Sequence, residues 1–170
     1  MLTRRQATLL GGAAMVTACG PRVTATERTE VLDSVDANMD WASLSDSEWK
    51  DRLTDQEFYV LRQEGTERAG TSPLDKNYED GTYVCAGCAL PLFTSDQKFD
   101  SGTGWPSFFD HLPGALETKR DFKLIVPRTE YHCSRCGGHQ GHVFKDGPRP
   151  TGLRYCNNGV ALDFVPATET

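Results

Sequence analysis

Cysteine is the residue type in this 170-residue chain that offers the most chemistry. Four cysteines form two C-x-x-C pairs, "CAGC" at Cys85 and Cys88 and "CSRC" at Cys133 and Cys136, while Cys156 stands apart in "GLRYCNN". A C-x-x-C pair can present two thiolates from one tight turn, as metal ligands or as a disulfide. A single cysteine is either a small buried apolar residue or a reactive thiol.

The two pairs together have the ligand set of a structural zinc site. Two such turns supply four sulfur atoms, the tetrahedral coordination that zinc prefers. The 44 residues between Cys88 and Cys133 exceed the roughly 15–20 of a compact zinc ribbon, so the site would join two distant hairpins. We predict one structural Zn²⁺ per chain, bound by Cys85, Cys88, Cys133 and Cys136.

Three other uses of the pairs remain open at this stage. Each pair could form a disulfide in an oxidising compartment. A thioredoxin-type redox motif is disfavoured, because neither pair opens a helix in a βαβ context. The ladder Cys133, Cys136, His139 and His142 could make a Cys₂His₂ site, although the first cysteine pair would then have no role.

The neighbours of Cys156 favour the reactive thiol. Arg154 would lie on the same strand face and could favour the thiolate, and Asn158 places amide donors near the same point. A thiolate beside hydrogen-bond donors is a nucleophile with a cradle for a developing negative charge. His139 and His142, in "GGHQGHVF", could be an acid–base pair, although backbone-bonded turn histidines explain their spacing as well.

A glycine-punctuated loop, "KFDSGTGWPSFF" at residues 98–109, ends in an aromatic and proline cluster. Its Trp105 and Phe108 could form an apolar wall beside a reactive group. Ordinary core packing explains the same two side chains equally simply.

The N-terminus is typical of an export signal. Arg4 and Arg5 precede an apolar run of about ten residues, which is too short for a hydrocarbon core that needs roughly 20. The adjacent arginines favour the twin-arginine (Tat) route. Cys19, in "VTAC", sits where bacterial lipoproteins are acylated, so residues 1–19 predict a lipid-anchored protein of the bacterial periplasm or cell envelope.

The remaining chain divides into a tether and one domain. Residues 20–45 show little periodicity and are predicted to be a flexible tether. The domain, residues 46–166, begins with two short helices: Ser45 or Ser47 could cap the first, and Thr54 with Glu57 the second. Trp49, Leu53, Phe58 and Leu61 could face the core.

The rest of the domain is predicted to be mainly β. Short runs rich in β-branched and aromatic residues are broken by Gly, Pro and Asp, which is typical of antiparallel strands. These runs are "GTYVCAGC", "PLFTSDQKF", "FKLIVPRTEYHC", "HVFKDG" and "LRYCNNGVALDFVP".

The net charge of −6 argues against a nucleic-acid partner, because an acidic chain has no electrostatic reason to seek phosphate backbones. Aspartate and glutamate are spread along the sequence and are interpreted as solvated surface. A non-catalytic zinc-stapled binding module is the alternative to an enzyme, but it leaves Cys156 and the histidine pair without a role.

Four motifs in one order resemble the type B methionine sulfoxide reductase family: "VCAGCALPLF", "KFDSGTGWPSF", "CSRCGGHQGHVFKDGP" and "GLRYCNNGVALDFVP". The segment "LTDQEFYVLRQEGTE" resembles the helical start of the same domain, so the match covers roughly residues 45–166. The resemblance implies two antiparallel sheets, zinc held by the two C-x-x-C pairs, and reduction of the R epimer of methionine sulfoxide in proteins and peptides.

The resemblance also implies roles for individual residues. Cys156 matches the nucleophile, and Trp105 matches the tryptophan that packs against the substrate methyl group. The residues that match polar groups around the sulfoxide oxygen or beside the nucleophile are His139, His142, Asn158 and Arg154. Attack by the thiolate would leave Cys156 as a sulfenic acid.

Two positions depart from the family pattern. Thr103 stands where many members carry a resolving cysteine, which predicts regeneration by an external thiol, either a thioredoxin-like protein or a small thiol. Gln140 stands where an apolar residue is frequent, which could alter local packing. The whole sequence thus predicts a membrane-tethered, exported reductase that repairs oxidised methionine.

Overall fold

The computed structural model describes residues 39–123 and 126–167. The predicted export signal with Cys19, and the predicted tether up to residue 38, lie outside the described residues. Among the residues that are described, no helix combines the length and the apolar character needed to cross a membrane.

Two short helices begin the domain, as predicted. Ser45 is the N-cap of α2 (Asp46–Arg52) and Thr54 is the N-cap of α3 (Asp55–Leu61), each with a complete capping box. In such a box the cap side chain and a glutamate three residues later satisfy each other's free backbone N–H groups, which fixes where the helix begins. The four predicted core residues of this region, Trp49, Leu53, Phe58 and Leu61, are all buried.

The segment before α2 is more ordered than the tether prediction for residues 20–45 implied. A short 3₁₀ helix, η1 (Trp41–Ser43), precedes α2, and Trp41 is only 4% exposed. Its indole stacks on Trp49 with ring centroids 5.8 Å apart. Met39 and Leu44, on either side of Trp41, also pack against the core, so apolar side chains hold residues 39–44 against the domain.

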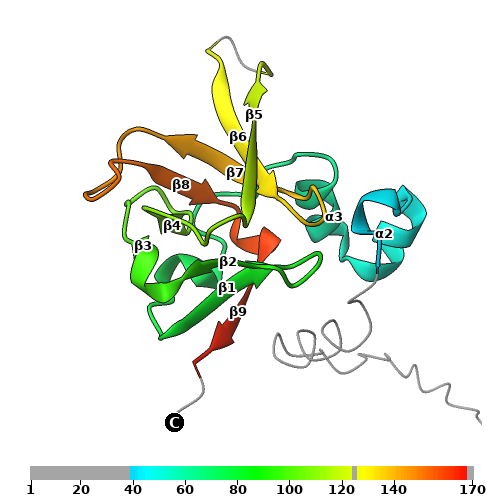
Figure 1. Cartoon of the computed structure of the whole chain (residues 1–170), viewed down its shortest axis with the longest axis horizontal. Coiled ribbons are helices and arrows are strands. Elements are labelled where there is room, and N and C mark those ends of the chain that lie inside the picture. Colours follow the sequence, from blue (N-terminus) through cyan, green and yellow to red (C-terminus); the bar gives the residue numbers. More distant parts are fainter. Residues whose placement is uncertain (1–38, 124–125, 168–170) are drawn as a thin grey trace, which may run out of the picture.

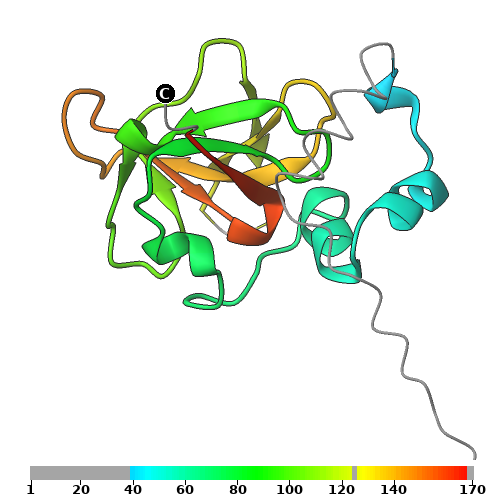
Figure 2. The same ribbon diagram turned by 90° about the horizontal axis from the view of Figure 1, so that it is seen from below.

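Three strands form the smaller sheet, in the order β2-β1-β9. They are β1 (Gly81–Cys85), β2 (Pro91–Thr94) and β9 (Leu162–Pro166), and all neighbours are antiparallel. The remaining short 3₁₀ helices are η2 (Pro73–Lys76), η3 (Ser95–Gln97) and η4 (Gly159–Ala161). α2 and α3 lie at one end of the molecule and β3 at the other (Figures 1 and 2).

Six strands form the larger antiparallel sheet, in the order β3-β4-β8-β7-β6-β5. They are β3 (Lys98–Phe99), β4 (Ser107–Phe108), β5 (Leu116–Asp121), β6 (Arg128–Cys133), β7 (His139–Phe144) and β8 (Arg154–Asn157). The prediction of a mainly β fold with two antiparallel sheets and short N-terminal helices is confirmed.

Strand β5 was not predicted from the sequence. Its letters, "LETKRD", lack an apolar face, because β5 is an edge strand that is largely exposed. The predicted strand at residues 122–133 in fact begins only at Arg128, directly after Pro127, which has no N–H to donate to a ladder. The β5–β6 hairpin projects from the body of the molecule (Figure 1).

An aromatic core joins the two sheets. Phe93 of β2 stacks on Phe108 of β4 with ring centroids 4.1 Å apart, and Tyr83, Tyr131 and Tyr155 surround them. Phe108 is fully buried here. It is therefore a core residue, and not part of an apolar wall beside a reactive group.

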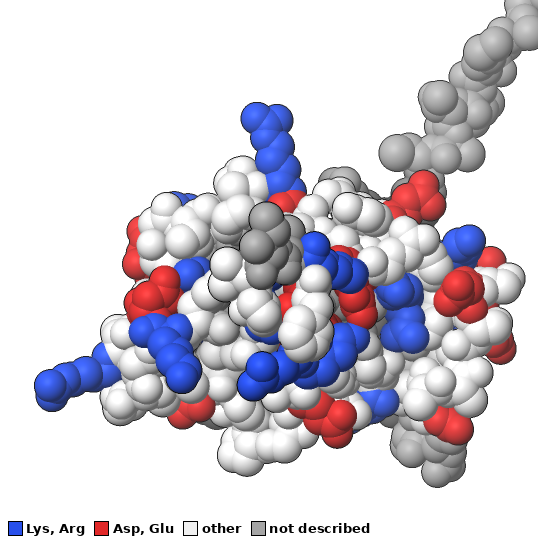
Figure 3. Space-filling view, turned by 90° about the horizontal axis from the view of Figure 1, so that it is seen from above, with Lys and Arg blue, Asp and Glu red and all other residues white. Residues whose placement is uncertain are grey.

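Charged side chains on the face around the β5–β6 hairpin are interspersed by sign (Figure 3). Lys119 and Lys123, for example, both pair with Glu64.

Candidate active site and four-cysteine cluster

The four paired cysteines meet in one buried cluster between the two sheets. Cys85 and Cys88 lie where β1 turns toward β2, and Cys133 and Cys136 lie where β6 turns toward β7. All four sulfur atoms lie within 4.8 Å of one another. The cluster therefore joins two distant hairpins, one from each sheet, as the spacing of the pairs predicted.

The geometry of this cluster fits a tetrahedral metal ion. The Cys85 and Cys136 sulfur atoms are 3.7 Å apart, and those of Cys88 and Cys133 are 3.5 Å apart. Zinc–sulfur bonds of about 2.3 Å in a tetrahedron require sulfur atoms about 3.8 Å apart. The four thiols share protons through their hydrogen bonds, so the pKa of Cys133 lies below its ordinary value while those of Cys85 and Cys88 lie above theirs.

The alternative uses of these cysteines find no support in the described residues. All five described cysteines are free thiols, so neither pair forms a disulfide. His139 and His142 bond to carboxylates instead of joining Cys133 and Cys136 in a metal site. The cysteine pairs therefore act together as one four-sulfur site.

Cys156 lies in a separate cavity of about 250 Å³. Strand pairing places it opposite His142 of β7 and Ser107 of β4. Side chains of several elements surround it: the cavity is lined by Thr66, Thr103, Trp105, Arg128, Gly141, His142, Phe144, Arg154, Cys156, Asn157 and Asn158. A thiol in a cavity of this size can be reached by a side chain of a bound molecule.

Two opposing effects set the pKa of Cys156. Burial raises the pKa of this thiol above its ordinary value and outweighs the opposing effects of Arg154 and of a hydrogen bond with Thr103. Arg154 thus acts in the predicted direction, but the effect of burial is larger. Its guanidinium is fixed by two hydrogen bonds to Asp146, of 2.9 and 2.8 Å. It therefore remains aligned to stabilise negative charge on the sulfur.

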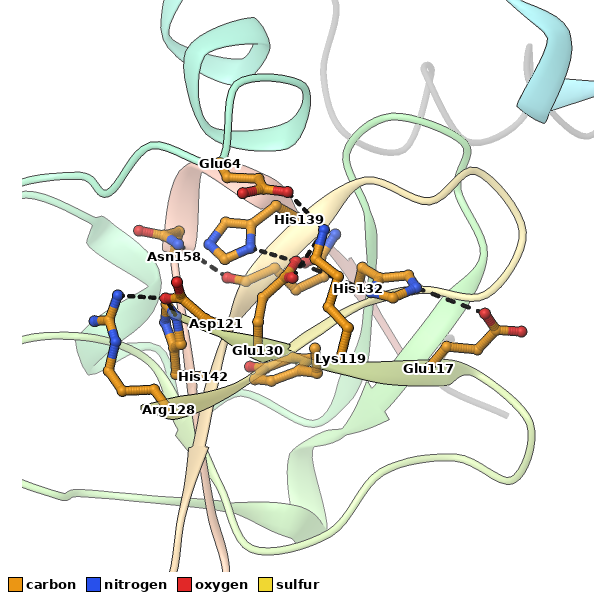
Figure 4. Close-up of polar contacts among 12 residues, drawn as sticks. Glu64, Glu117, Lys119, Asp121, Arg128, Glu130, His132, His139, His142 and Asn158 are labelled. Atoms are coloured by element: carbon orange, nitrogen blue, oxygen red, sulfur yellow. Dashed lines mark hydrogen bonds and ion pairs between the residues drawn. The ribbon is translucent and has the colours of Figure 1, made fainter. Parts of the chain in front are cut away.

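His142 also lines the cavity and is held by the β5–β6 hairpin. Its Nε2 lies 2.8 Å from Asp121 Oδ2, and Arg128 donates to the same carboxylate oxygen (Figure 4). Burial lowers the pKa of His142, while the hydrogen bond with Asp121 opposes that effect. His142 lines the same cavity as Cys156, where an imidazole can donate or accept a proton.

His139 lies behind His142 rather than on the cavity wall. It is 2% exposed, and its Nδ1 lies 2.8 Å from Glu130 Oε1 (Figure 4). The two imidazole rings meet edge to face, with centroids 5.5 Å apart. Lys119 pairs with the second oxygen of Glu130 at 3.0 Å, so His139 belongs to a buried charge network that supports the position of His142.

Asn158 and Trp105 are joined through one buried glutamate. The backbone N–H of Glu67 donates to Asn158 Oδ1 at 3.0 Å, and its carbonyl accepts from Trp105 Nε1 at 3.2 Å. The Glu67 carboxylate accepts from the backbone N–H groups of Gly159 and Val160. Asn158 Nδ2 donates one hydrogen to Gln140 O and keeps a second, so it can still donate into the cavity.

A comparison with protein-family models matches residues 53–166 to the SelR domain. The chain belongs to the SelR-domain family. Relatives named peptide methionine sulfoxide reductase MsrB include one from Leptospira interrogans, 54% identical over 121 residues, 71% of this chain and 92% of that protein. Another, from Agrobacterium fabrum, is 52% identical over 123 residues, 72% of this chain and 91% of that protein. The resemblance to type B methionine sulfoxide reductases is confirmed.

A plant relative shows the same similarity. The chloroplastic peptide methionine sulfoxide reductase B1 of Arabidopsis thaliana is 52% identical over 132 residues, 77% of this chain and 65% of that protein. Within this SelR domain, the structure brings together at the cavity five residues that were singled out from the sequence, namely Cys156, His142, Arg154, Asn158 and Trp105. It does not bring His139 or Phe108 to the cavity wall.

Several residues of this SelR domain that sequence reasoning missed are acidic. Glu67 and Glu130 are 5% and 2% exposed, so the interpretation of the acidic residues as solvated surface is wrong for both. Asp121 and Asp146, which orient His142 and Arg154, were missed for the same reason. The sequence around these four carboxylates does not indicate their burial, because an acidic residue next to basic residues has the same local pattern whether it faces water or a site.

Proposed function

We propose that this chain reduces the R epimer of methionine sulfoxide in peptides and proteins to methionine, with Cys156 as the attacking sulfur. The observation that carries the proposal is the cavity itself, in a chain of the SelR-domain family. A half-buried thiol faces a tryptophan, a histidine held by a carboxylate, and an arginine held by a second carboxylate. This set can bind a small apolar group, donate a proton and stabilise a thiolate.

The proposed reaction transfers one oxygen atom to Cys156. The thiolate attacks the electrophilic sulfur of the sulfoxide, which pushes negative charge onto the oxygen. His142 protonates that oxygen, and Asn158 donates a hydrogen bond to it. Attack forms an S–S bond between Cys156 and the substrate sulfur. The protonated oxygen then transfers, as a hydroxyl group, from the substrate sulfur to the Cys156 sulfur, while the substrate S–O bond and the S–S bond both break. Cys156 is left as a sulfenic acid, and methionine leaves as a thioether. Cys156 sulfur is oxidised by two electrons, and the sulfoxide sulfur is reduced by two.

Trp105 is proposed to bind the methyl group of the substrate. Its indole lines the cavity on the side of the loop at residues 98–109, and its N–H is fixed by Glu67 O. A methyl group held against the ring and an oxygen held by His142 leave one place for the rest of the side chain. The R and S epimers exchange two of these groups, so only one can present its sulfur to Cys156.

Replacing Asp121 with asparagine should shift the pH dependence of turnover. Asp121 opposes the effect of burial on His142, so its loss lowers the pKa of His142 further. Because the protonated form is the acid, activity falls as pH rises through that pKa, and in the variant this fall occurs at lower pH. We expect turnover at neutral pH to drop about tenfold. The pH profile of kcat checks this, and an unshifted profile would show that His142 is not the acid.

Regeneration is proposed to use an external thiol. Thr103 occupies the loop next to Cys156 and hydrogen-bonds to it, so no sulfur stands there to attack a sulfenic acid. The other cysteines of the described residues are buried in the metal-type cluster. A thioredoxin-like protein or a small thiol would therefore reduce Cys156 directly.

One turnover without reductant should leave Cys156 as a trappable sulfenic acid. Mass spectrometry after reaction with a dimedone-type probe measures it, and a disulfide between Cys156 and another cysteine of the chain would refute the prediction. The matched variant is Thr103→Cys, which places a thiol within contact of Cys156. We expect that variant to form an internal disulfide and to lose the probe signal.

The four-cysteine cluster is proposed to hold one structural Zn²⁺. Four sulfur ligands leave no coordination position for substrate, and the cluster and the Cys156 cavity have no lining residue in common. When bound, the ion supplies a cross-link between the two sheets and neutralises the thiolates. Cys85, Cys88, Cys133 and Cys136 would be its ligands.

The location of the protein is proposed from residues 1–19. Paired arginines, a short apolar run and the "VTAC" box support export by the Tat route and acylation of Cys19, which would tether the reductase to a membrane of the bacterial envelope. There it would repair oxidised envelope proteins. Labelling with a radioactive fatty acid, compared between the natural sequence and Cys19→Ala, tests the anchor. Equal labelling of both would exclude it.

A further inference from the structure

Gln140 joins the four-cysteine cluster to the strand that carries Cys156. This residue of β7 is 0% exposed, although it carries an uncharged polar side chain. Its Nε2 donates to the sulfur of Cys85 at 3.4 Å, and its Oε1 accepts from Asn157 Nδ2 at 3.2 Å. One carboxamide therefore contacts both a cluster sulfur and the residue that follows Cys156.

The contacts of Gln140 extend into a buried polar network. Asn157 is also 0% exposed; its Oδ1 accepts from Tyr131 Oη at 2.8 Å. The backbone oxygen of Gln140 accepts from Asn158 twice, from its N–H at 2.8 Å and from its Nδ2 at 3.0 Å. Gln140 thus fixes the two residues after Cys156, one through its side chain and the other through its main chain.

Close packing of the two strands lets this network act on Cys156. Gly141 pairs with Asn157 in the β7–β8 ladder, and His142 pairs with Cys156. A Cβ atom on Gly141 would overlap the carbonyl oxygen of Cys156, so the strands approach as closely as their backbones allow. Gln140 directly precedes the Gly141–His142 segment that packs against Cys156 and Asn157.

The hydrogen-bond directions agree with a metal-ligating sulfur at Cys85. A thiolate can only accept, so the amide of Gln140 must turn its nitrogen toward Cys85 and its oxygen toward Asn157. Asn157 then donates to Gln140 and accepts from Tyr131, so each side chain in this series of hydrogen bonds has a partner. An amide N–H directed at a ligand sulfur withdraws charge from it and holds its orientation, which strengthens a metal site.

We propose that Gln140 is a positioning residue that couples the metal cluster to the catalytic strand. It holds the Cys85 sulfur from one side and the Asn157–Asn158 segment from the other, so that loss of its amide loosens both. The inference rests on the proposed function and on a metal in the cluster. An apolar side chain of similar size would fill the same space without either contact.

The test compares Gln140→Leu with Tyr131→Phe, both zinc-loaded. Tyr131→Phe removes one hydrogen bond from Asn157 in the same network, but the cluster sulfur keeps its amide contact. We expect Gln140→Leu to release zinc to a chelating dye about tenfold faster than the natural sequence, because metal sites bind more weakly when a group that hydrogen-bonds to a ligand is lost. We expect Tyr131→Phe to release zinc at the natural rate. We also expect Gln140→Leu to lower kcat about tenfold with KM within about twofold.

Two results would overturn the proposal: an unchanged rate of zinc release in Gln140→Leu, or equal acceleration in both variants, which would indicate general loosening of the core. If Gln140→Leu does not fold, Gln140→Met, with an unbranched chain of similar length, takes its place in the same comparison. Zinc release does not depend on turnover. An inactive natural protein would therefore refute the proposed function without deciding this inference.

Discussion

Replacing Cys156 with serine is expected to abolish sulfoxide reduction, with turnover falling on the order of 10⁴-fold or more. A serine hydroxyl is not ionised near neutral pH, and its oxygen attacks a sulfoxide sulfur poorly compared with a thiolate. The substitution is nearly the same size and lies in the cavity rather than in the core, so the fold should persist. Single-turnover assays with a peptide methionine sulfoxide measure the effect.

The folding control for that experiment is the metal content and melting temperature of the serine variant. Both should equal those of the natural sequence, since Cys156 belongs to the cavity and not to the four-cysteine cluster. A variant that keeps its metal, its melting temperature and most of its activity would show that another group attacks the substrate. The proposed chemistry would then have no nucleophile.

Removal of the metal should have the largest effect on stability. Without a cation, four buried sulfur atoms within 4.8 Å of one another must share protons in a desolvated site, and the link between the two sheets is lost. We expect a loss of at least about 4 kcal/mol in the free energy of unfolding, which lowers the melting temperature by roughly 15 °C for a domain of this size.

The measurement is thermal unfolding of the natural protein before and after treatment with a strong chelator, and again after zinc is restored. Cys133→Ser should unfold at low temperature and should not respond to added zinc, because one ligand is missing. An unaltered melting temperature in the chelated protein, with metal loss verified by elemental analysis, would contradict the structural role of the cluster.

The sequence was most informative where chemistry and spacing coincide. The two C-x-x-C pairs meet in one cluster, and Thr54 with Glu57 caps the second helix, both as predicted. For the first helix the sequence offered Ser45 or Ser47, and the structure shows that Ser45 is the cap. The pattern of aromatic and β-branched runs likewise predicted the antiparallel sheets. These features depend on short segments, which a single sequence displays directly.

What the sequence could not reveal depends on residues that meet across the fold. Asp121 bonds to His142 from 21 positions away, and Glu67 bonds to the segment after Cys156 from more than 90 positions away. No local pattern separates these carboxylates from exposed ones. Strand β5 was missed because an edge strand needs no apolar face, and Trp41 was missed because one aromatic residue in a polar stretch gives no periodicity.

Gln140 is a residue that the sequence singled out but could not explain. The sequence showed an unusual residue at this position, but only the structure shows that its amide reaches both Cys85 and Asn157. A departure from a family pattern therefore indicated where to search, and the contacts supplied the physical meaning. The comparison of zinc release between Gln140→Leu and Tyr131→Phe tests directly whether these contacts stabilise the metal cluster.

The central claim is best tested by supplying the separate R and S epimers of a peptide methionine sulfoxide to the zinc-loaded protein with dithiothreitol as reductant. The account predicts that the R epimer is converted to methionine and that the S epimer remains. Reduction of both epimers at similar rates would contradict the arrangement of Trp105 and His142 around the sulfoxide. Reduction of neither by folded protein would indicate a zinc-stapled binding module in which Cys156 has no catalytic role.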